Sequence, residues 1–183
     1  PENYLQRSVS KNTVLGILSR LIGDQRKLYQ ARQSEYFYFS DIENIIDISF
    51  YDGFKASSKE QASQMLARIN QDYLAGNSIH WAIIDKQIDK IVGTCGYYRG
   101  FERDAGELGC ILIPQYEGKG LMTEALKLAI DFGTDTMGLK RIFAITNNYN
   151  SKAKQLLHRL NFKKIAESDN DEIEYEYINT SSV

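Results

Sequence analysis

Residues 114–121, with the sequence PQYEGKGL, have the composition of an anion-binding turn between a strand and a helix. Gly118 and Gly120 permit backbone dihedrals that are closed to other residues, and they let a ligand approach the main chain. Pro114 lacks an amide and ends a strand ladder. We therefore expect the amides of residues 116–121 to gather at a helix start, where unpaired N–H groups and the helix dipole favour phosphate.

The spacing in this segment disfavours two well-known phosphate loops. A Walker A loop has Ser or Thr directly after Gly-Lys. Here Gly120 follows Lys119, so this requirement is not met. A dinucleotide fingerprint needs Gly or Ala three residues after its second glycine, where this chain has Thr123. Glycines also form turns that bind nothing, but the flanking apolar strand and amphipathic helix favour a phosphate ligand.

The elements that position this loop follow from the hydrophobic period. Residues 79–85, 91–98 and 106–113 form short apolar runs with hairpin-length connections, which predict an antiparallel meander. The period then changes: Leu121, Ala125, Leu128 and Phe132 mark one face of a helix. A strand at residues 141–146 follows, and a right-handed crossover would make it parallel to residues 106–113. The expected fold class is therefore α/β (α+β), a mixed, mostly antiparallel sheet with one parallel pair, flanked by helices.

The remaining elements are predicted from caps and periodicity. Ser57 with Glu60 fits a capping box before a helix that stops at residues 76–77. A second amphipathic helix over residues 153–160 ends at Asn161, a residue type that tolerates the left-handed conformation. Residues 163–166 and 173–178 form a hairpin. Upstream, helical spacing suggests one or two helices across residues 11–33, followed by the aromatic run at residues 36–39.

The spacing Gln115-x-x-Gly118-x-Gly120 resembles the Arg/Gln-x-x-Gly-x-Gly/Ala signature of the GNAT superfamily of N-acetyltransferases. Four further segments are similar to the ribosomal-protein (RimJ/RimL-like) branch: Glu107–Gly109, Gly118–Leu126, Asn148-x-x-Ser151 and Leu160–Phe162. The resemblance covers about residues 57–178 and implies a GNAT-like fold in which the parallel pair is splayed. It also implies a single acetyltransferase domain over residues 1–183, with an acetyl-CoA-binding core at 57–178 and an acceptor-side region at 1–56.

The resemblance assigns roles to particular residues. Glu107 would act as the base through a water molecule, and Ser151 would give a proton to the leaving thiolate. Backbone groups on the strand would hold the pantetheine arm and polarise the thioester carbonyl, the loop would grip the pyrophosphate, and Asn148 would contact the arm. The implied cofactor-binding set is Cys110, Ile111, Leu112, Ile113, Gln115, Tyr116, Glu117, Gly118, Lys119, Gly120, Leu121, Asn148, Ser151 and Lys154.

Each of these side chains also has a purely structural interpretation. Glu107 could be an ordinary exposed strand carboxylate. Asn148 and Ser151 stand where helix-capping residues occur, and Lys154 could be a solvated helix lysine. The alternating acids Glu172, Glu174 and Glu176 fit a strand with one solvated face, or they could attract a cationic acceptor.

The composition of the chain limits the classes of partner that we expect it to bind. The chain has 183 residues, 43% of them apolar, and a net charge of -2, which suits one globular domain without a basic field for nucleic acid or membranes. With no secretory-type start and no apolar run near the ~20 residues of a membrane span, we expect a cytoplasmic protein. Cys95 and Cys110 are interpreted as small buried residues, and no metal site is expected. A homodimer remains open.

The resulting hypothesis is an acetyl-CoA-dependent N-acetyltransferase that modifies a primary amine. A protein N-terminal α-amine, with a pKa near 8, loses its proton more easily than lysine, with a pKa of about 10.4. A polyamine, amino sugar or antibiotic remains an alternative acceptor. A non-catalytic acetyl-CoA-binding sensor module is a second class of function.

Overall fold

A seven-stranded sheet in the order β1-β4-β5-β6-β7-β9-β8 dominates the described part of the chain. The computed structural model describes residues 13–14, 50–51, 54–55, 57–85, 88 and 90–179. The sheet strands are β1 (Thr13–Val14), β4 (Ile79–Asp85), β5 (Lys90–Tyr97), β6 (Ala105–Leu112), β7 (Arg141–Asn147), β8 (Phe162–Glu167) and β9 (Glu172–Tyr177). Strands β2 (Phe50–Tyr51) and β3 (Phe54–Lys55) form a separate antiparallel pair.

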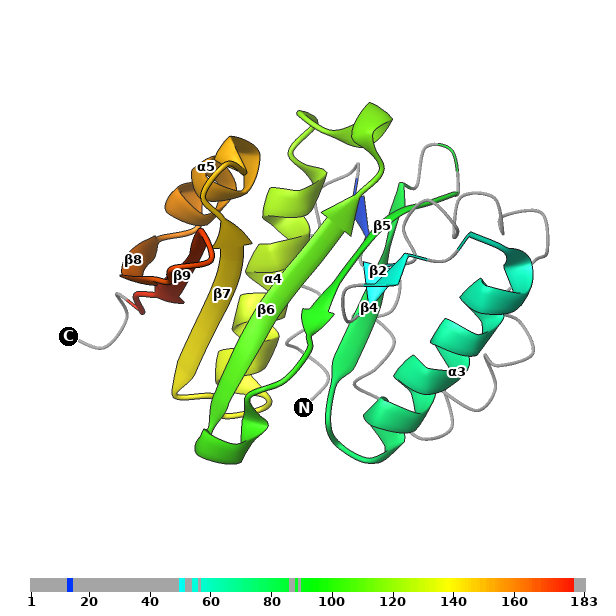
Figure 1. The fold of residues 1–183 in the computed structure, drawn as a ribbon, viewed down its shortest axis with the longest axis horizontal. Helices are drawn as coiled ribbons and strands as arrows, with labels where there is room; N and C mark the ends of the chain where they lie inside the picture. The colour runs from blue at the N-terminus through cyan, green and yellow to red at the C-terminus, as the bar shows by residue number, and fades with distance from the viewer. Residues whose placement is uncertain are drawn as a thin grey trace.

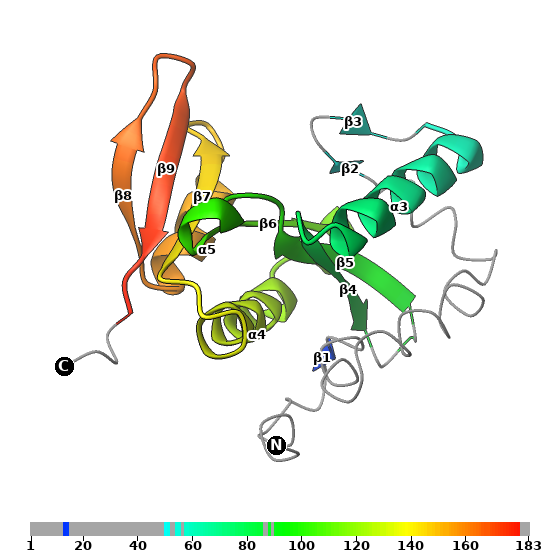
Figure 2. The ribbon, with the colours of Figure 1, turned by 90° about the horizontal axis from the view of Figure 1, so that it is seen from below.

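Three helices accompany the sheet in this part of the chain: α3 (Lys59–Leu74), α4 (Leu121–Asp135) and α5 (Ser151–Arg159). Short 3-10 turns, η3 (Phe101–Arg103) and η4 (Pro114–Tyr116), flank β6. In Figure 1 the β4–β7 strands run side by side, and Figure 2 shows α4 and α3 on opposite faces of the sheet. The only parallel neighbours among the described strands are β6 and β7, joined through α4. The predicted mixed sheet with one parallel pair is confirmed.

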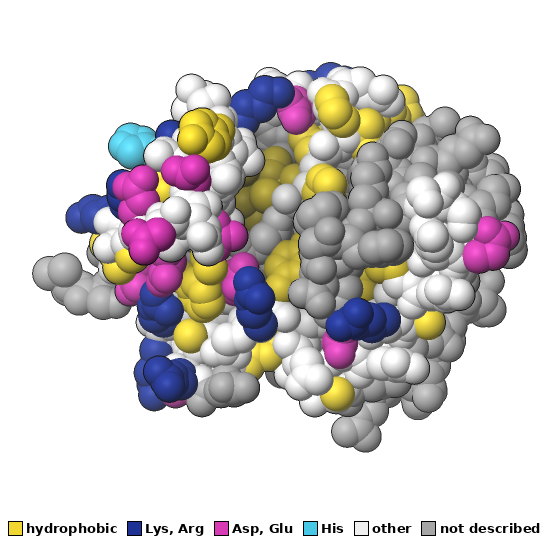
Figure 3. Space-filling view, in the orientation of Figure 1, with side chains coloured by type: hydrophobic (Ala, Val, Ile, Leu, Met, Phe, Trp, Pro, Cys, Tyr) yellow, Lys and Arg dark blue, Asp and Glu magenta, His cyan; other side chains and the backbone are white. Residues whose placement is uncertain are grey.

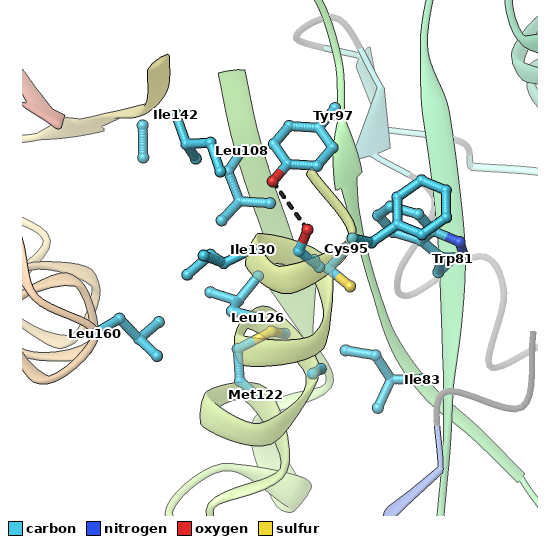
Figure 4. Packing of buried hydrophobic residues seen from close by; sticks show 14 of the residues in the cluster. Trp81, Ile83, Cys95, Tyr97, Leu108, Met122, Leu126, Ile130, Ile142 and Leu160 are labelled. Carbon is cyan, nitrogen blue, oxygen red and sulfur yellow. Dashed lines mark hydrogen bonds between the residues drawn. The ribbon is translucent and has the colours of Figure 1, made fainter. Parts of the chain in front are cut away.

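The core lies between the sheet and α4. Along α4 the buried residues recur at helical spacing: Leu121, Met122, Ala125, Leu126, Ala129, Ile130, Phe132 and Gly133. Tyr97 of β5 crosses this layer and donates its hydroxyl to the Ala129 carbonyl at 2.9 Å (Figure 4). A Cβ on Gly133 would lie 2.2 Å from that hydroxyl, so only glycine lets the helix pack this closely. The contact fixes α4, and thereby the loop that precedes it, against the sheet.

Several local predictions differ from the structure by small amounts. The cap of α3 is Ser58, which accepts from the Gln61 amide, so the predicted Ser57 and Glu60 box was wrong by one residue. Both registers fit the sequence pattern, because serine occupies both positions and an acid or amide stands three residues after each. Asn161 has a φ of 65° after α5, which confirms the predicted left-handed end.

Two further predictions fail or lie outside the structure. Thr13 and Val14 pair with β4, so a helix across residues 11–33 is wrong at this point, and the rest of that segment lies outside the described residues. The aromatic run at 36–39 lies outside them too. Cys95 is buried, as predicted, but Cys110 is exposed. Cys110 lies on the same face of β6 as Leu108 and Leu112. It comes after Glu107, the last residue of β6 that pairs with β7, and the core does not cover it there.

Burial of His80 makes stability depend on pH. The His80 ring packs edge-on against that of Tyr98, with 4.5 Å between the ring centroids. Burial lowers the pKa of His80 from 6.5 to about 4, although the charge of Asp72 acts to raise it. Between these values the unfolded chain binds a proton that the folded chain does not. Stability is therefore expected to fall as pH decreases from 6.5 to 4, by ~3 kcal/mol for this group.

Denaturant unfolding at pH 7 and pH 4.5 checks this. A His80→Gln variant should lose less stability over the interval than the unaltered chain, because glutamine does not titrate. Equal losses in the two proteins would contradict the assignment to His80.

Candidate functional site

The two parallel strands separate soon after they begin. Pairing between β6 and β7 runs only from Ala105 with Arg141 to Glu107 with Phe143. Beyond this point β6 continues to Leu112 beside β5, while β7 continues to Asn147 beside β9. Figure 3 shows a hollow with an apolar floor between the α5–β7 side of the molecule and the end of β6. The predicted splay of the parallel pair is confirmed.

The backbone of β6 turns an unpaired edge toward this gap. The Ile113 amide donates to the Val92 carbonyl at 2.9 Å, and the Glu107 carbonyl accepts from the Tyr98 amide at 3.0 Å, so both residues face β5. Backbone groups alternate in direction along a strand. Those of Cys110 and Leu112 therefore point to the other side, past the end of the ladder with β7. Of the predicted arm-binding residues, these two have backbone groups in the right direction, whereas Ile111 and Ile113 direct theirs to β5.

The loop after β6 brings a row of amides to the start of α4. Gly118 and Gly120 have φ values of 76° and 82°, and Gly120 is the N-cap of α4. In the described chain, no protein acceptor is found for any amide from Gly118 to Thr123, and Glu124 is the first to bond back, to Gly120. A Cβ added at Gly118 or Gly120 would meet nothing within 4 Å. The loop thus presents successive donors to open space at a helix N-terminus, a geometry suited to a diphosphate.

Two amides predicted to point outward do not. Those of Tyr116 and Glu117 donate to Ile113 and Pro114 inside the η4 turn, at 2.9 and 3.1 Å. The prediction for residues 116–121 was therefore wrong at its first two positions, because the proline starts a 3-10 turn that uses them. Their side chains still belong to the loop. Tyr116 is half-buried under the Lys119 ammonium, which lies 5.0 Å from its ring centroid, whereas Gln115 is exposed.

Glu107 lies at the point where the two strands separate, on the opposite sheet face from Leu108 and α4. Its carboxylate is held by Arg99, with Nε to Oε2 at 2.5 Å and Nη2 to Oε1 at 3.3 Å. The side chain of Glu107 is only 14% exposed. Tyr98 and Arg99 both bond to Glu107 through the main chain, two residues opposite one, as in a β-bulge. The bulge turns Arg99 onto the carboxylate, so Glu107 is an ordered group rather than a freely solvated one.

The β7–α5 connection holds the remaining predicted residues. Asn148 donates from Nδ2 to Glu167 at 3.2 Å, and its backbone carbonyl accepts from the Lys154 ammonium at 2.6 Å. Lys154 therefore ties the connection to α5. Ser151 is the first, exposed residue of α5, and the cap is Asn150, whose side chain accepts from the Ala153 amide at 3.0 Å. Neither Asn148 nor Ser151 caps the helix.

The acidic residues of β9 are neutralised in part. Arg141 of β7 forms ion pairs with Glu176, at 2.7 Å, and with Glu174. Its guanidinium carbon lies 4.6 Å from the centroid of Phe143. Glu174 and Glu176 are thus engaged within the sheet face, which leaves the strand less able to attract a cation than its sequence suggests.

Three side chains in the segments around the site were missed by the sequence analysis: Arg99, Asn150 and Lys152. Asn150 had a local signal, since Asn before Ser-Lys-Ala is a strong cap. Arg99 and Lys152 had none, because each pairs with a residue on another element, Glu107 and Glu117. In the described part of the chain, three or more metal-ligand side chains do not gather. None of the helices described here is long and apolar enough to span a membrane.

Comparison with known proteins agrees with this geometry. Residues 26–163 match the family model described as "Acetyltransferase (GNAT) domain". An uncharacterized N-acetyltransferase, p20, from Bacillus licheniformis is 35% identical over 105 residues, which are 57% of this chain and 59% of that protein. The [ribosomal protein uS5]-alanine N-acetyltransferase of Escherichia coli is 32% identical over 102 residues, 54% of this chain and 52% of the relative. The chain thus spans between half and two thirds of these curated relatives.

Among solved structures, the ribosomal-protein-S5-alanine acetyltransferase of Vibrio fischeri superposes with a TM-score of 0.63. It shares 25% sequence identity, and the match covers 79% of this chain and 85% of that one. The resemblance to the ribosomal-protein branch therefore extends from motifs to the fold, at modest identity.

Proposed function

The chain belongs to the acetyltransferase (GNAT) domain family of N-acetyltransferases, and on this basis we propose that it transfers the acetyl group of acetyl-CoA to a primary amine. The observation that carries the proposal is the run of amides from Gly118 to Thr123, which find no acceptor within the described chain. These amides fit the diphosphate of CoA, because unpaired N–H groups at a helix N-terminus bind phosphate. The open space at both glycines leaves room for it.

The donor would run from this loop down the gap between β6 and β7. Gly118–Thr123 would hold the diphosphate, and the backbone groups of Cys110 and Leu112 would bond the pantetheine arm along the free edge of β6. Bound acetyl-CoA supplies an activated thioester. An amide on this edge would donate to the thioester carbonyl, in the manner of an oxyanion hole. Because the donors are main-chain groups fixed by β5 pairing and by α4, they need little reorganisation on binding.

Glu107 is the proposed proton acceptor. It stands at the apex of the gap, and Arg99 holds its carboxylate in one orientation. Two carboxylate oxygens offer about four lone-pair sites, so the pairing with Arg99 leaves positions for a bridging water. That water passes the proton of the incoming ammonium to Glu107. Ser151, exposed at the start of α5, remains the proposed donor to the thiolate, and the helix N-terminus there also favours a developing anion.

The proposed acceptor is a protein N-terminal α-amine. The named activities of the Escherichia coli and Vibrio fischeri relatives support this class. The lower pKa of an α-amine also supports this acceptor class, because a single carboxylate can then serve as the base.

An assay of thiol release from acetyl-CoA tests the function. The acceptors are a peptide with a free N-terminal alanine, the same peptide with its N-terminus blocked, spermidine and an amino sugar. We expect release with the free peptide and none with the blocked one. Release with only the small amines would reassign the acceptor, and tight acetyl-CoA binding without any turnover would indicate a sensor module.

A further inference from the structure

An ion pair joins the two sides of the gap between β6 and β7. Glu117 belongs to the loop after β6, and Lys152 lies in the first turn of α5, which follows β7. Their side chains form an ion pair. Since the strands that lead to them separate beyond Glu107 and Phe143, this pair links the two walls across the open end.

The position of Glu117 raises an electrostatic problem. It is immediately before Gly118, at the edge of the row of free amides, and its side chain is only 35% exposed. A carboxylate there lies beside the place proposed for a diphosphate, and like charges at short distance oppose binding. The loop itself offers a single cation, Lys119, whose ammonium lies over Tyr116. The Lys152 ammonium is the group in contact with the Glu117 carboxylate.

We propose that Lys152 is a positioning residue of the donor site: its ammonium cancels the Glu117 carboxylate and ties the phosphate loop to α5. This inference rests on the proposed use of acetyl-CoA. The Lys152 side chain is 77% exposed, so the ion pair contributes little to folding. Its effect falls on the anion, because removing Lys152 leaves an uncompensated carboxylate next to the phosphates. Lys152 acts through Glu117 and needs no contact of its own with the donor.

Calorimetric titration with acetyl-CoA tests this in four proteins: the unaltered chain, Lys152→Met, Glu117→Gln and the double variant. Lys152→Met should raise the Kd roughly five- to tenfold, well below the effect of a charge placed in the diphosphate volume itself, because Glu117 stands at the edge of the amide row and water screens part of its charge. Glu117→Gln should bind at least as tightly as the unaltered chain. The double variant should match Glu117→Gln, since the charge that Lys152 cancels is then gone. Raising the salt concentration should shrink the Lys152→Met defect.

The control is Lys140→Met, which breaks another exposed lysine–carboxylate pair, with Asp104. It should leave the Kd unchanged, and thermal unfolding of Lys152→Met should match that of the unaltered chain. An unchanged Kd in Lys152→Met would overturn the inference and leave the proposed function standing. A double variant as weak as Lys152→Met would also overturn it, because Lys152 would then act independently of Glu117. Absence of binding to the unaltered chain would overturn both proposals.

Discussion

Replacement of Gly120 by glutamate is expected to abolish acetyl-CoA binding. Gly120 caps α4 with a φ of 82°, and a Cβ there points into open space beside the free amides. A glutamate side chain would enter the volume proposed for the diphosphate and add a negative charge to it. At about 4 Å in a partly solvated site, one such repulsion is worth about 4 kcal/mol, or roughly a thousandfold in Kd. Calorimetry or thermal-shift titration with acetyl-CoA measures it.

The matched control is Gly138→Glu. Gly138 follows the far end of α4, has a φ of 69°, and also has nothing within 4 Å of a built Cβ. Both variants therefore introduce the same residue at a left-handed, open position, with a similar backbone penalty of roughly 1–2 kcal/mol. Only Gly120→Glu should lose binding. Equal affinities in the two variants would remove the diphosphate from this loop.

Substitution of Glu107 by glutamine is expected to lower kcat by about 100-fold or more, the usual contribution of a positioned general base. Glutamine keeps the shape of the side chain and one acceptor for Arg99, but it does not take up a proton at neutral pH. The Kd for acetyl-CoA should change little, because Glu107 projects from the sheet face opposite α4. Single-turnover rates measured across pH, together with Kd values, separate the two effects.

Glu176→Gln serves as the control for this variant. Glu176 shares the sheet face with Glu107 and is likewise paired to an arginine, Arg141, at 2.7 Å. If loss of a carboxylate anywhere on this face slowed turnover, both variants would be slow, and the role of Glu107 as base would be refuted. An unaffected rate in Glu107→Gln would refute it as well.

The features predicted best were those that are determined by residues within one short segment of the chain. The loop at residues 114–121 is defined by one proline and two glycines with fixed conformational preferences, and the structure places both glycines at positive φ. Asn161 ends α5 for the same reason. The meander and the crossover followed from changes of hydrophobic period, which report on burial along a single element.

Features that depend on partners across the fold were not predictable. Glu107 was recognised as a candidate base, but its pairing with Arg99 arises from a bulge opposite it, and nothing in the sequence marks that bulge. The link between Glu117 and Lys152 joins residues 35 positions apart on elements that meet only once the strands have separated. The cap of α3 was misplaced by one residue because two adjacent serines fit the same motif, and side-chain geometry decides between them.

The early departure of β6 from β7 has a consequence for the behaviour of the folded chain in solution. Unpaired strand edges at the rim of a sheet are templates for pairing with another molecule, and they promote aggregation. Here the unpaired stretch lies in the interior of the sheet order, with strands of the same molecule on both sides. The unpaired N–H and C=O groups of β6 can therefore bind a small ligand, while the neighbouring strands hinder a strand of a second copy from pairing with them.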